Sequence, residues 1–311
     1  MKVVFFGSSN FSVPPLRSIS PLVSCVITRK AKPRGRGYMV EDTEVKKEAM
    51  NLHLPVVEID SFRDEAIREI EACKAELFVV ASFGLIVPKG VLDLPSVGPV
   101  NIHPSLLPKY RGASPIQWAL LNGDDQTGIT FIRMNERMDA GNILYQEAQP
   151  IGETDNMISL SARLSRRAAE ILPGFLEQVV MRGLGQGVEQ DHGKATYTPI
   201  ITREMGRIDW SQSAERILRQ VRALVAWPKA YTFLDGLMLK IFDGTVDNWR
   251  QGSDTGEPGT IVDVSKEGIH VITGKGVLVI NELQLQNKKR MKAYDFSQGY
   301  RGLREKVLKK D

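Results

Sequence analysis

Residues 98–115 read Gly98-Pro-Val-Asn-Ile-His-Pro-Ser-Leu-Leu-Pro-Lys-Tyr-Arg-Gly-Ala-Ser-Pro115. The apolar part of this stretch, Pro99–Ile102, predicts a short buried strand. Asn101 and His103 are two residues apart, so strand geometry puts both side chains on one face of the sheet. Pro104 and Pro108 cannot continue the pairing, and the chain must leave the sheet in a stiff loop. We therefore expect an amide and an imidazole to project together from the end of a strand.

Strand-like and helical segments alternate before this stretch. The helical segments include Glu44–Asn51 and Asp64–Ala72. The strand-like runs are short and rich in Val, Ile and Phe: Val3–Phe6, Leu22–Ile27, Leu54–Val57 and Leu77–Ala81. This alternation predicts an α/β fold with a doubly wound, mostly parallel, Rossmann-like sheet. Ligand sites in such sheets lie at the carboxyl ends of the strands, where Asn101 and His103 are expected.

The residues that follow extend the same unit. Two more strands are predicted at Thr127–Met134 and Ile143–Gln146. Asp139 comes after the first of them, where its carboxylate could come within hydrogen-bonding range of His103. Residues 110–117 predict a polar loop, and residues 154–182 predict a long amphipathic helix that proline 173 should kink or split.

The last third of the chain has a different pattern of predicted elements, mostly short strands. Residues 189–206 are polar and predict a linker between a unit at 1–188 and a unit at 207–311. In the latter, Ala214–Ala226 predicts a helix. Glycine-punctuated apolar runs predict a small antiparallel OB-like β-barrel, with strands at Ala230–Leu234, Met238–Phe242, Thr260–Val264, Ile269–Thr273 and Val277–Leu283.

Composition excludes several classes of protein. With 311 residues, 42% hydrophobic and 25% charged, the chain is an ordinary globular protein rather than a disordered or coiled-coil one. Two cysteines and four histidines favour neither a disulfide framework nor a metal centre. No apolar run reaches the roughly 18 residues of a membrane span. We expect a reduced, cytoplasmic, monomeric protein without a metal ion or a membrane segment.

Positive charge is concentrated in two places. The net charge is +4, and residues 207–311 hold 18 lysines and arginines against 13 acidic residues. Residues 29–36 hold five positive charges in eight positions. Such charge can serve solubility alone, but it also suits a polyanionic partner such as RNA.

The Asn-Ile-His-Pro-Ser-Leu-Leu-Pro run at 101–108, followed by Asp139, resembles the signature of the folate-dependent formyltransferases. Residues 81–88 are similar to the strand and loop that precede this signature in the family. Residues 206–210, 221–228 and 283–291 resemble the C-terminal domain of the branch that formylates methionyl-tRNA. Pro33-Arg-Gly-Arg-Gly37 resembles the basic loop of that branch, which engages the acceptor arm of tRNA.

The resemblance implies a catalytic domain at 1–188 and a tRNA-binding domain at 207–311. It implies formyl transfer from 10-formyltetrahydrofolate to the amino group of initiator methionyl-tRNA. The implied catalytic residues are Asn101, His103 and Asp139. The implied folate contacts are Ser105, Leu106, Leu107, Pro108, Phe83, Gly84, Leu85 and Ile86. The implied RNA contacts are Arg34, Arg36, Lys288, Lys289 and Arg290.

The chemistry of formyl transfer fits this residue set. The reaction passes through a tetrahedral intermediate, whose oxyanion must be stabilised while protons move between the two nitrogens. A neutral amine is itself the nucleophile, so the reaction needs no serine or cysteine and no covalent enzyme intermediate. We expect Asn101 to donate to the oxyanion. Protonated His103 would also donate and would supply a proton to the leaving nitrogen, with Asp139 orienting it and favouring its charged form.

Other functions remain open at this stage. A formyltransferase acting on an amino-sugar nucleotide would share the same centre but would not need the basic loop. A formyl-folate hydrolase would use water as the acceptor. An RNA-binding protein without catalysis would leave the convergence of Asn101, His103 and Asp139 unexplained.

Overall fold

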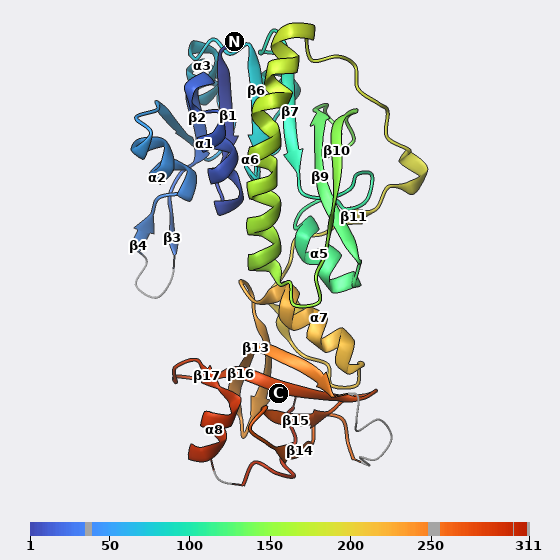
Figure 1. Ribbon diagram of the computed structural model, residues 1–311. Helices are drawn as coiled ribbons and strands as arrows, with labels where there is room; N and C mark the ends of the chain where they lie inside the picture. The colour runs from blue at the N-terminus through green and yellow to red at the C-terminus, as the bar shows by residue number, and fades with distance from the viewer. Residues whose placement is uncertain (35–38, 248–255, 301, 310–311) are drawn as a thin grey trace. The chain divides into compact units, whose positions relative to one another are not determined.

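The computed structural model describes residues 1–34, 39–247, 256–300 and 302–309 (Figure 1). The chain forms two compact units. The first comprises residues 1–115, 126–150 and 160–198, and the second comprises residues 116–125, 151–159 and 199–311. The second unit thus contains two short segments, 116–125 and 151–159, that interrupt the first unit along the chain.

A seven-stranded sheet forms the centre of the first unit. Its order is β10-β9-β7-β6-β1-β2-β5. Neighbours from β7 to β5 are parallel, whereas β9 and β10 are antiparallel. The strand bounds are β1 Val3–Gly7, β2 Val23–Arg29, β5 Val56–Ile59, β6 Leu77–Ala81, β7 Gly98–His103, β9 Gln126–Arg133 and β10 Ile143–Pro150. This arrangement confirms the predicted doubly wound, mostly parallel sheet.

Helices cover both faces of this sheet (Figure 1). On one face, Phe6, Phe78 and Phe83 meet edge to face in a core cluster that also includes Ile70. The opposite face carries α6, whose Ser165 hydroxyl donates to the Phe11 carbonyl at 2.6 Å. The helix bounds are α1 Val13–Ser18, α2 Glu44–Asn51, α3 Asp64–Ala72, α4 Lys89–Leu92 and α6 Met157–Arg182, with a 3-10 turn, η1, at Asn10–Ser12. The central strands are buried on both sides, which explains their continuous apolar runs.

Pro173 does not split α6, which is one helix from Met157 to Arg182. Of the two outcomes expected from the sequence, a kink or a split, the split does not occur. A proline inside a helix costs about 3 kcal/mol. A buried row on α6 outweighs this cost, because each buried leucine contributes about 1.5–3 kcal/mol. The row comprises Leu160, Leu164, Ala168, Leu172, Leu176 and Val179.

The stretch after β7 differs from the prediction in a second respect. Residues 110–117 were expected to form a loop, but helix α5 begins at Pro115 and ends at Asn122. Proline is favoured at the first helical position, where its missing N–H has no intrahelical partner anyway. The polar loop therefore ends at Ser114, and Arg111–Gly112 forms a short strand, β8.

An antiparallel sheet in the order β12-β13-β16-β15-β14 forms the second unit, with β17 paired to β16. The bounds are α7 Ala214–Leu224, β12 Ala230–Leu234, β13 Leu237–Asp247, β14 Ile261–Val264, β15 Ile269–Ile272, β16 Val277–Leu285, β17 Met291–Lys292 and α8 Ala293–Gly299. The segment near residues 305–309 bridges β12 at Phe233 and the start of β14 at Thr260. It thereby joins the two edge strands, which confirms the predicted antiparallel domain.

Candidate active site

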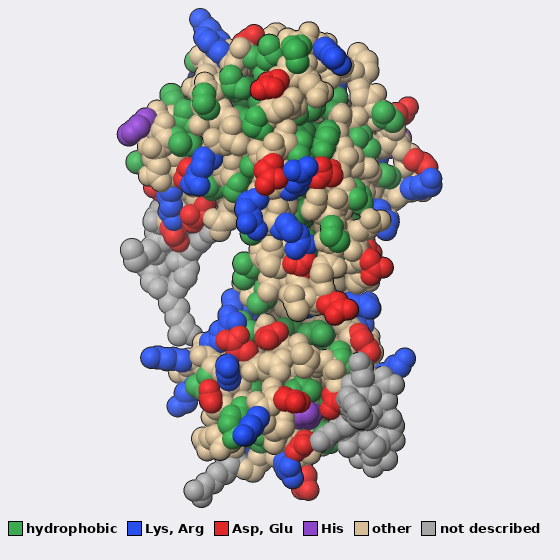
Figure 2. Space-filling view, in the orientation of Figure 1, with side chains coloured by type: hydrophobic (Ala, Val, Ile, Leu, Met, Phe, Trp, Pro, Cys, Tyr) green, Lys and Arg blue, Asp and Glu red, His purple; other side chains and the backbone are tan. Residues whose placement is uncertain are grey.

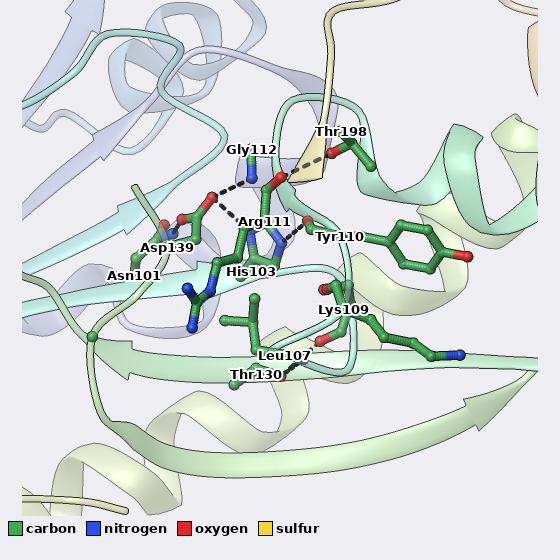
Figure 3. Close-up of polar contacts among 12 residues, drawn as sticks. Asn101, His103, Leu107, Lys109, Tyr110, Arg111, Gly112, Thr130, Asp139 and Thr198 are labelled. Carbon is green, nitrogen blue, oxygen red and sulfur yellow. Dashed lines mark hydrogen bonds and ion pairs between the residues drawn. The ribbon is translucent and has the colours of Figure 1, made fainter. Parts of the chain in front are cut away.

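Asn101 and His103 lie on β7, and Asp139 lies in the turn after β9, the neighbouring strand of the sheet. The three side chains meet at the carboxyl end of β7 (Figure 3). The Asn101 Nδ2 donates to Asp139 Oδ1 at 3.1 Å, and His103 Nδ1 lies 3.6 Å from Asp139 Oδ2. Folding thus brings together an amide, an imidazole and a carboxylate, all from one chain.

His103 is buried, at 4% exposure, and both of its ring nitrogens face acceptors. Nε2 lies 2.9 Å from the Tyr110 carbonyl oxygen, which can only accept, so Nε2 must carry a proton. Nδ1 faces the Asp139 carboxylate. At 3.6 Å, Nδ1 and the carboxylate are within ion-pair distance but beyond the range of a hydrogen bond.

The Asp139 turn is tightly constrained. Asp139 has φ +49°, a left-handed conformation that aspartate tolerates better than most residues. Its Oδ2 also accepts from the Gly112 N–H at 2.8 Å. Two residues on, a Cβ at Gly141 would lie 1.8 Å from the Arg133 carbonyl oxygen, so only glycine fits there. These contacts fix the carboxylate against β7.

Residues 105–108 form a loop whose polar groups are used internally. The Ser105 hydroxyl donates to the Lys109 backbone carbonyl, and the Thr130 hydroxyl donates to the Ser105 carbonyl at 2.6 Å. The Leu107 N–H donates to the Thr130 hydroxyl, and the Leu107 carbonyl accepts from the Gln146 side-chain amide. Ser105 and Leu107 are buried, whereas Leu106 and Pro108 are partly exposed. Leu106 and Pro108 are thus the members of this loop available for apolar contact.

The segment Phe83–Ile86 follows β6, the strand next to β7 in the sheet. Phe83 packs in the core and offers no surface to a ligand. Gly84, Leu85 and Ile86 reach the surface, and Ile86 is 75% exposed. An exposed isoleucine at the carboxyl edge of a sheet suits an apolar ligand group.

Residues 190–198 support the site, although the sequence predicted only a linker there. β11, Tyr197–Thr198, pairs in parallel with β8. The Thr196 hydroxyl accepts from the Tyr110 N–H at 2.8 Å, and the Thr198 hydroxyl donates to the Arg111 carbonyl at 3.1 Å. No periodicity or motif in this polar segment signals these contacts, because each is a single hydrogen bond between remote parts of the chain.

The residues expected to bind RNA fall into three groups. Arg34 ends β3, Lys32–Arg34, and Arg36 lies outside the described residues. Lys288 and Lys289 are exposed in the turn between β16 and β17. Arg290 instead forms a bidentate ion pair with Glu282 and lies over the Phe242 ring at 4.3 Å. On the face drawn in Figure 2, basic side chains are interspersed with acidic ones.

Within the described residues, no cluster of three or more His, Cys, Asp or Glu side chains could hold a metal ion. In the same part of the chain, no helix is long and apolar enough to cross a membrane.

The formyl transferase family model matches residues 1–176, and the model of the formyl transferase C-terminal domain matches residues 200–301. The chain belongs to the formyl transferase family. Methionyl-tRNA formyltransferase of Bacillus subtilis is 41% identical over 303 residues, which cover 96% of this chain and 94% of the relative. The enzyme of the same name from Citrifermentans bemidjiense is 40% identical over 305 residues, covering 97% and 94%. The resemblance to the formyltransferases, stated from the sequence, is confirmed.

Two solved structures share the fold. WlaRD, a sugar 3N-formyl transferase, superposes with a TM-score of 0.66 at 19% identity, covering 93% of this chain and 99% of that one. HypX from Aquifex aeolicus in complex with tetrahydrofolic acid gives a TM-score of 0.63 at 19% identity, covering 98% and 48%. At these identities the likeness concerns the fold alone.

Proposed function

We propose that this formyl transferase moves the formyl group of 10-formyltetrahydrofolate onto the amino group of initiator methionyl-tRNA. The observation that carries the proposal is full-length similarity to methionyl-tRNA formyltransferases, combined with the Asn101–His103–Asp139 cluster. The three groups come from one chain, so the proposal needs no second copy. We also propose that the activity is cytoplasmic.

Asn101 is assigned to the oxyanion. Within the described residues, one of its two Nδ2 hydrogens has a partner, the Asp139 carboxylate. Asn101 is partly exposed, so its second hydrogen can donate to the oxygen of the tetrahedral intermediate. Asp139 holds the amide in this orientation. The amine attacks, the C–N bond to folate breaks, and the leaving folate nitrogen takes up a proton as the ammonium loses one.

His103 is assigned to proton supply. Its Nε2 proton is directed at the Tyr110 carbonyl in this structure, so Nε2 must exchange that partner for the substrate. A charged ring next to the Asp139 carboxylate provides the proton for the leaving nitrogen. This exchange would couple proton transfer to substrate binding.

The folate and tRNA contacts are proposed on separate surfaces. Leu106, Pro108 and residues 84–86 would contact the flat heterocycle of the folate. Residues 33–37, of which 35–37 lie outside the described residues, would contact phosphates together with Lys288 and Lys289. We propose a catalytic domain at 1–188, a connecting segment at 189–206 and a tRNA-binding domain at 207–311, with no metal ion required for the chemistry described.

A side-by-side acceptor assay tests the function. The protein is supplied with 10-formyltetrahydrofolate and offered charged initiator methionyl-tRNA, an amino-sugar nucleotide, or no amine. We expect formylation of the tRNA alone. Faster formylation of the amino-sugar nucleotide would show that the protein is a sugar formyltransferase. Turnover of the formyl folate without any amine would identify a hydrolase.

Salt dependence tests the basic contacts. Raising the salt concentration from 50 to about 200 mM should raise the KM for tRNA steeply, because each phosphate contact releases counterions. The KM for the formyl donor should change little. Equal effects on both substrates would remove the basic loop and the lysine pair from the proposal.

A further inference from the structure

Gln190 connects the two loops that hold the His103–Asp139 pair. Its Nε2 donates to the carbonyl oxygens of Asp139 at 2.8 Å and Gly141 at 2.6 Å. Its Oε1 accepts from Arg111 Nη2 at 2.7 Å and Nε at 3.1 Å. Gln190 is 3% exposed, and both ends of its amide are therefore used inside the protein.

Arg111 lies between Tyr110, which contacts His103, and Gly112, which contacts Asp139. On one side, the Tyr110 carbonyl faces His103 Nε2, and on the other, the Gly112 N–H donates to Asp139 Oδ2. A shift of Arg111 therefore displaces both contacts at once. Because Gln190 holds Arg111 and the Asp139 turn together, it fixes the distance between these two loops.

Arg111 is 2% exposed, and in the described part of the chain no carboxylate pairs with it. Its other partners are the Tyr197 hydroxyl at 3.1 Å and His192 Nδ1 at 2.9 Å. A buried cation held only by neutral acceptors is costly. A carboxylate at position 190 would relieve this cost, yet it would have no hydrogen to donate to the Asp139 turn.

We propose that Gln190 is a positioning residue for the reaction: its amide is required because it accepts from Arg111 and donates to the Asp139 turn at the same time. This inference rests on the proposed function. Gln190 is buried, and it acts through the conformation of Asp139, whose φ of +49° its hydrogen bond supports.

Gln190→Glu separates positioning from structural support. The new carboxylate pairs with Arg111 through charge-assisted hydrogen bonds, so the melting temperature should be kept or raised. Its second oxygen faces the Asp139 and Gly141 carbonyls, which repel it and push the turn away. We expect kcat to fall about 10- to 100-fold, with both KM values within about threefold of the wild type, because small misplacements of reacting groups cost rate.

Gln220→Glu is the matched control. Gln220 Nε2 also donates to two backbone carbonyls, those of Met205 at 2.7 Å and Arg207 at 3.0 Å, but it lies in the second unit. The kcat of Gln220→Glu should equal that of the wild type. Gln190→Met, which removes the donors without adding a charge, serves if the buried carboxylate prevents folding, and its folded fraction should show the same loss of kcat.

A second readout does not depend on the substrate. The NMR chemical shifts of the His103 ring, measured in the full chain at one pH, should change in Gln190→Glu and stay unchanged in Gln220→Glu. Wild-type kcat together with unchanged His103 chemical shifts in folded Gln190→Glu would overturn the proposal. Failure of the wild-type protein to formylate methionyl-tRNA would instead refute the proposed function, while the chemical shifts would still decide the role of Gln190.

Discussion

Asp139→Asn is the sharpest test of the catalytic cluster, because it keeps the shape of the side chain and removes its charge. The carboxylate accepts from Asn101 Nδ2 at 3.1 Å and from the Gly112 N–H at 2.8 Å, and it faces His103 Nδ1 at 3.6 Å. An asparagine has one acceptor side and one donor side. Whichever way it turns, its NH2 group meets either Asn101 or Gly112 donor to donor.

The magnitudes follow from this conflict. One unpaired donor in a half-buried site costs about 1–3 kcal/mol, and replacing a charge-assisted bond by a neutral one costs about 1 kcal/mol more. The free energy of unfolding should therefore fall by roughly 2–4 kcal/mol. Misdirection of the Asn101 amide, together with loss of the negative charge opposite His103, should lower kcat on the order of 100- to 1000-fold.

The assay combines urea unfolding at pH 7 with kcat at saturating formyl donor and methionyl-tRNA. Asp155→Asn is the matched control, because Asp155 is 6% exposed and accepts from the Gly152 N–H and the Ser159 hydroxyl, each at 2.8 Å. It should lose stability while keeping kcat. A folded Asp139→Asn protein within threefold of wild-type kcat would refute the reasoning, as would an equal loss of kcat in Asp155→Asn.

Three further predictions concern other parts of the first unit. The hydrogen bond from Arg167 holds the pKa of Glu147 at about 2, below its unfolded value of about 4.3, so its stabilisation is present above pH 4.3 and is lost as the pH falls toward 2. Glu147→Gln should cost about 1 kcal/mol in urea unfolding at pH 7 and less at pH 3, and a cost independent of pH would contradict this. Thr130→Val removes the hydroxyl that bridges two backbone groups of the loop after β7. It should lower the free energy of unfolding by about 1–3 kcal/mol and raise the KM for the formyl donor more than it lowers kcat, whereas an unchanged KM would separate this loop from folate binding. The thiol contact between Cys25 and Cys73 lowers the pKa of Cys73 and raises that of Cys25, which is also buried. Mass spectrometry after iodoacetamide treatment of the folded protein should find Cys73 alkylated first, and the reverse order would show that the contact does not control reactivity.

Local sequence was sufficient to predict the structure wherever one physical rule acts over a few neighbouring residues. The apolar runs located the parallel strands of the large sheet, and the central strands β1 and β6 are continuously apolar because they are buried on both faces. The period of two placed Asn101 and His103 on one face of β7. Prolines were less reliable guides: Pro173 is accommodated within α6 by packing, and Pro115 begins a helix rather than extending a loop.

The sequence by itself determined the alternation that makes the sheet, the antiparallel second domain and the amide–imidazole pair at the end of β7. Only the tertiary structure decided how that pair is held. Asp139 is 38 residues from Asn101, and Gln190 is 79 residues from Arg111. Hydrogen bonds between such distant residues leave no periodic pattern, since each depends on where folding puts two loops rather than on the residues beside them. For the same reason, a polar segment that has the composition of a linker supports the candidate active site.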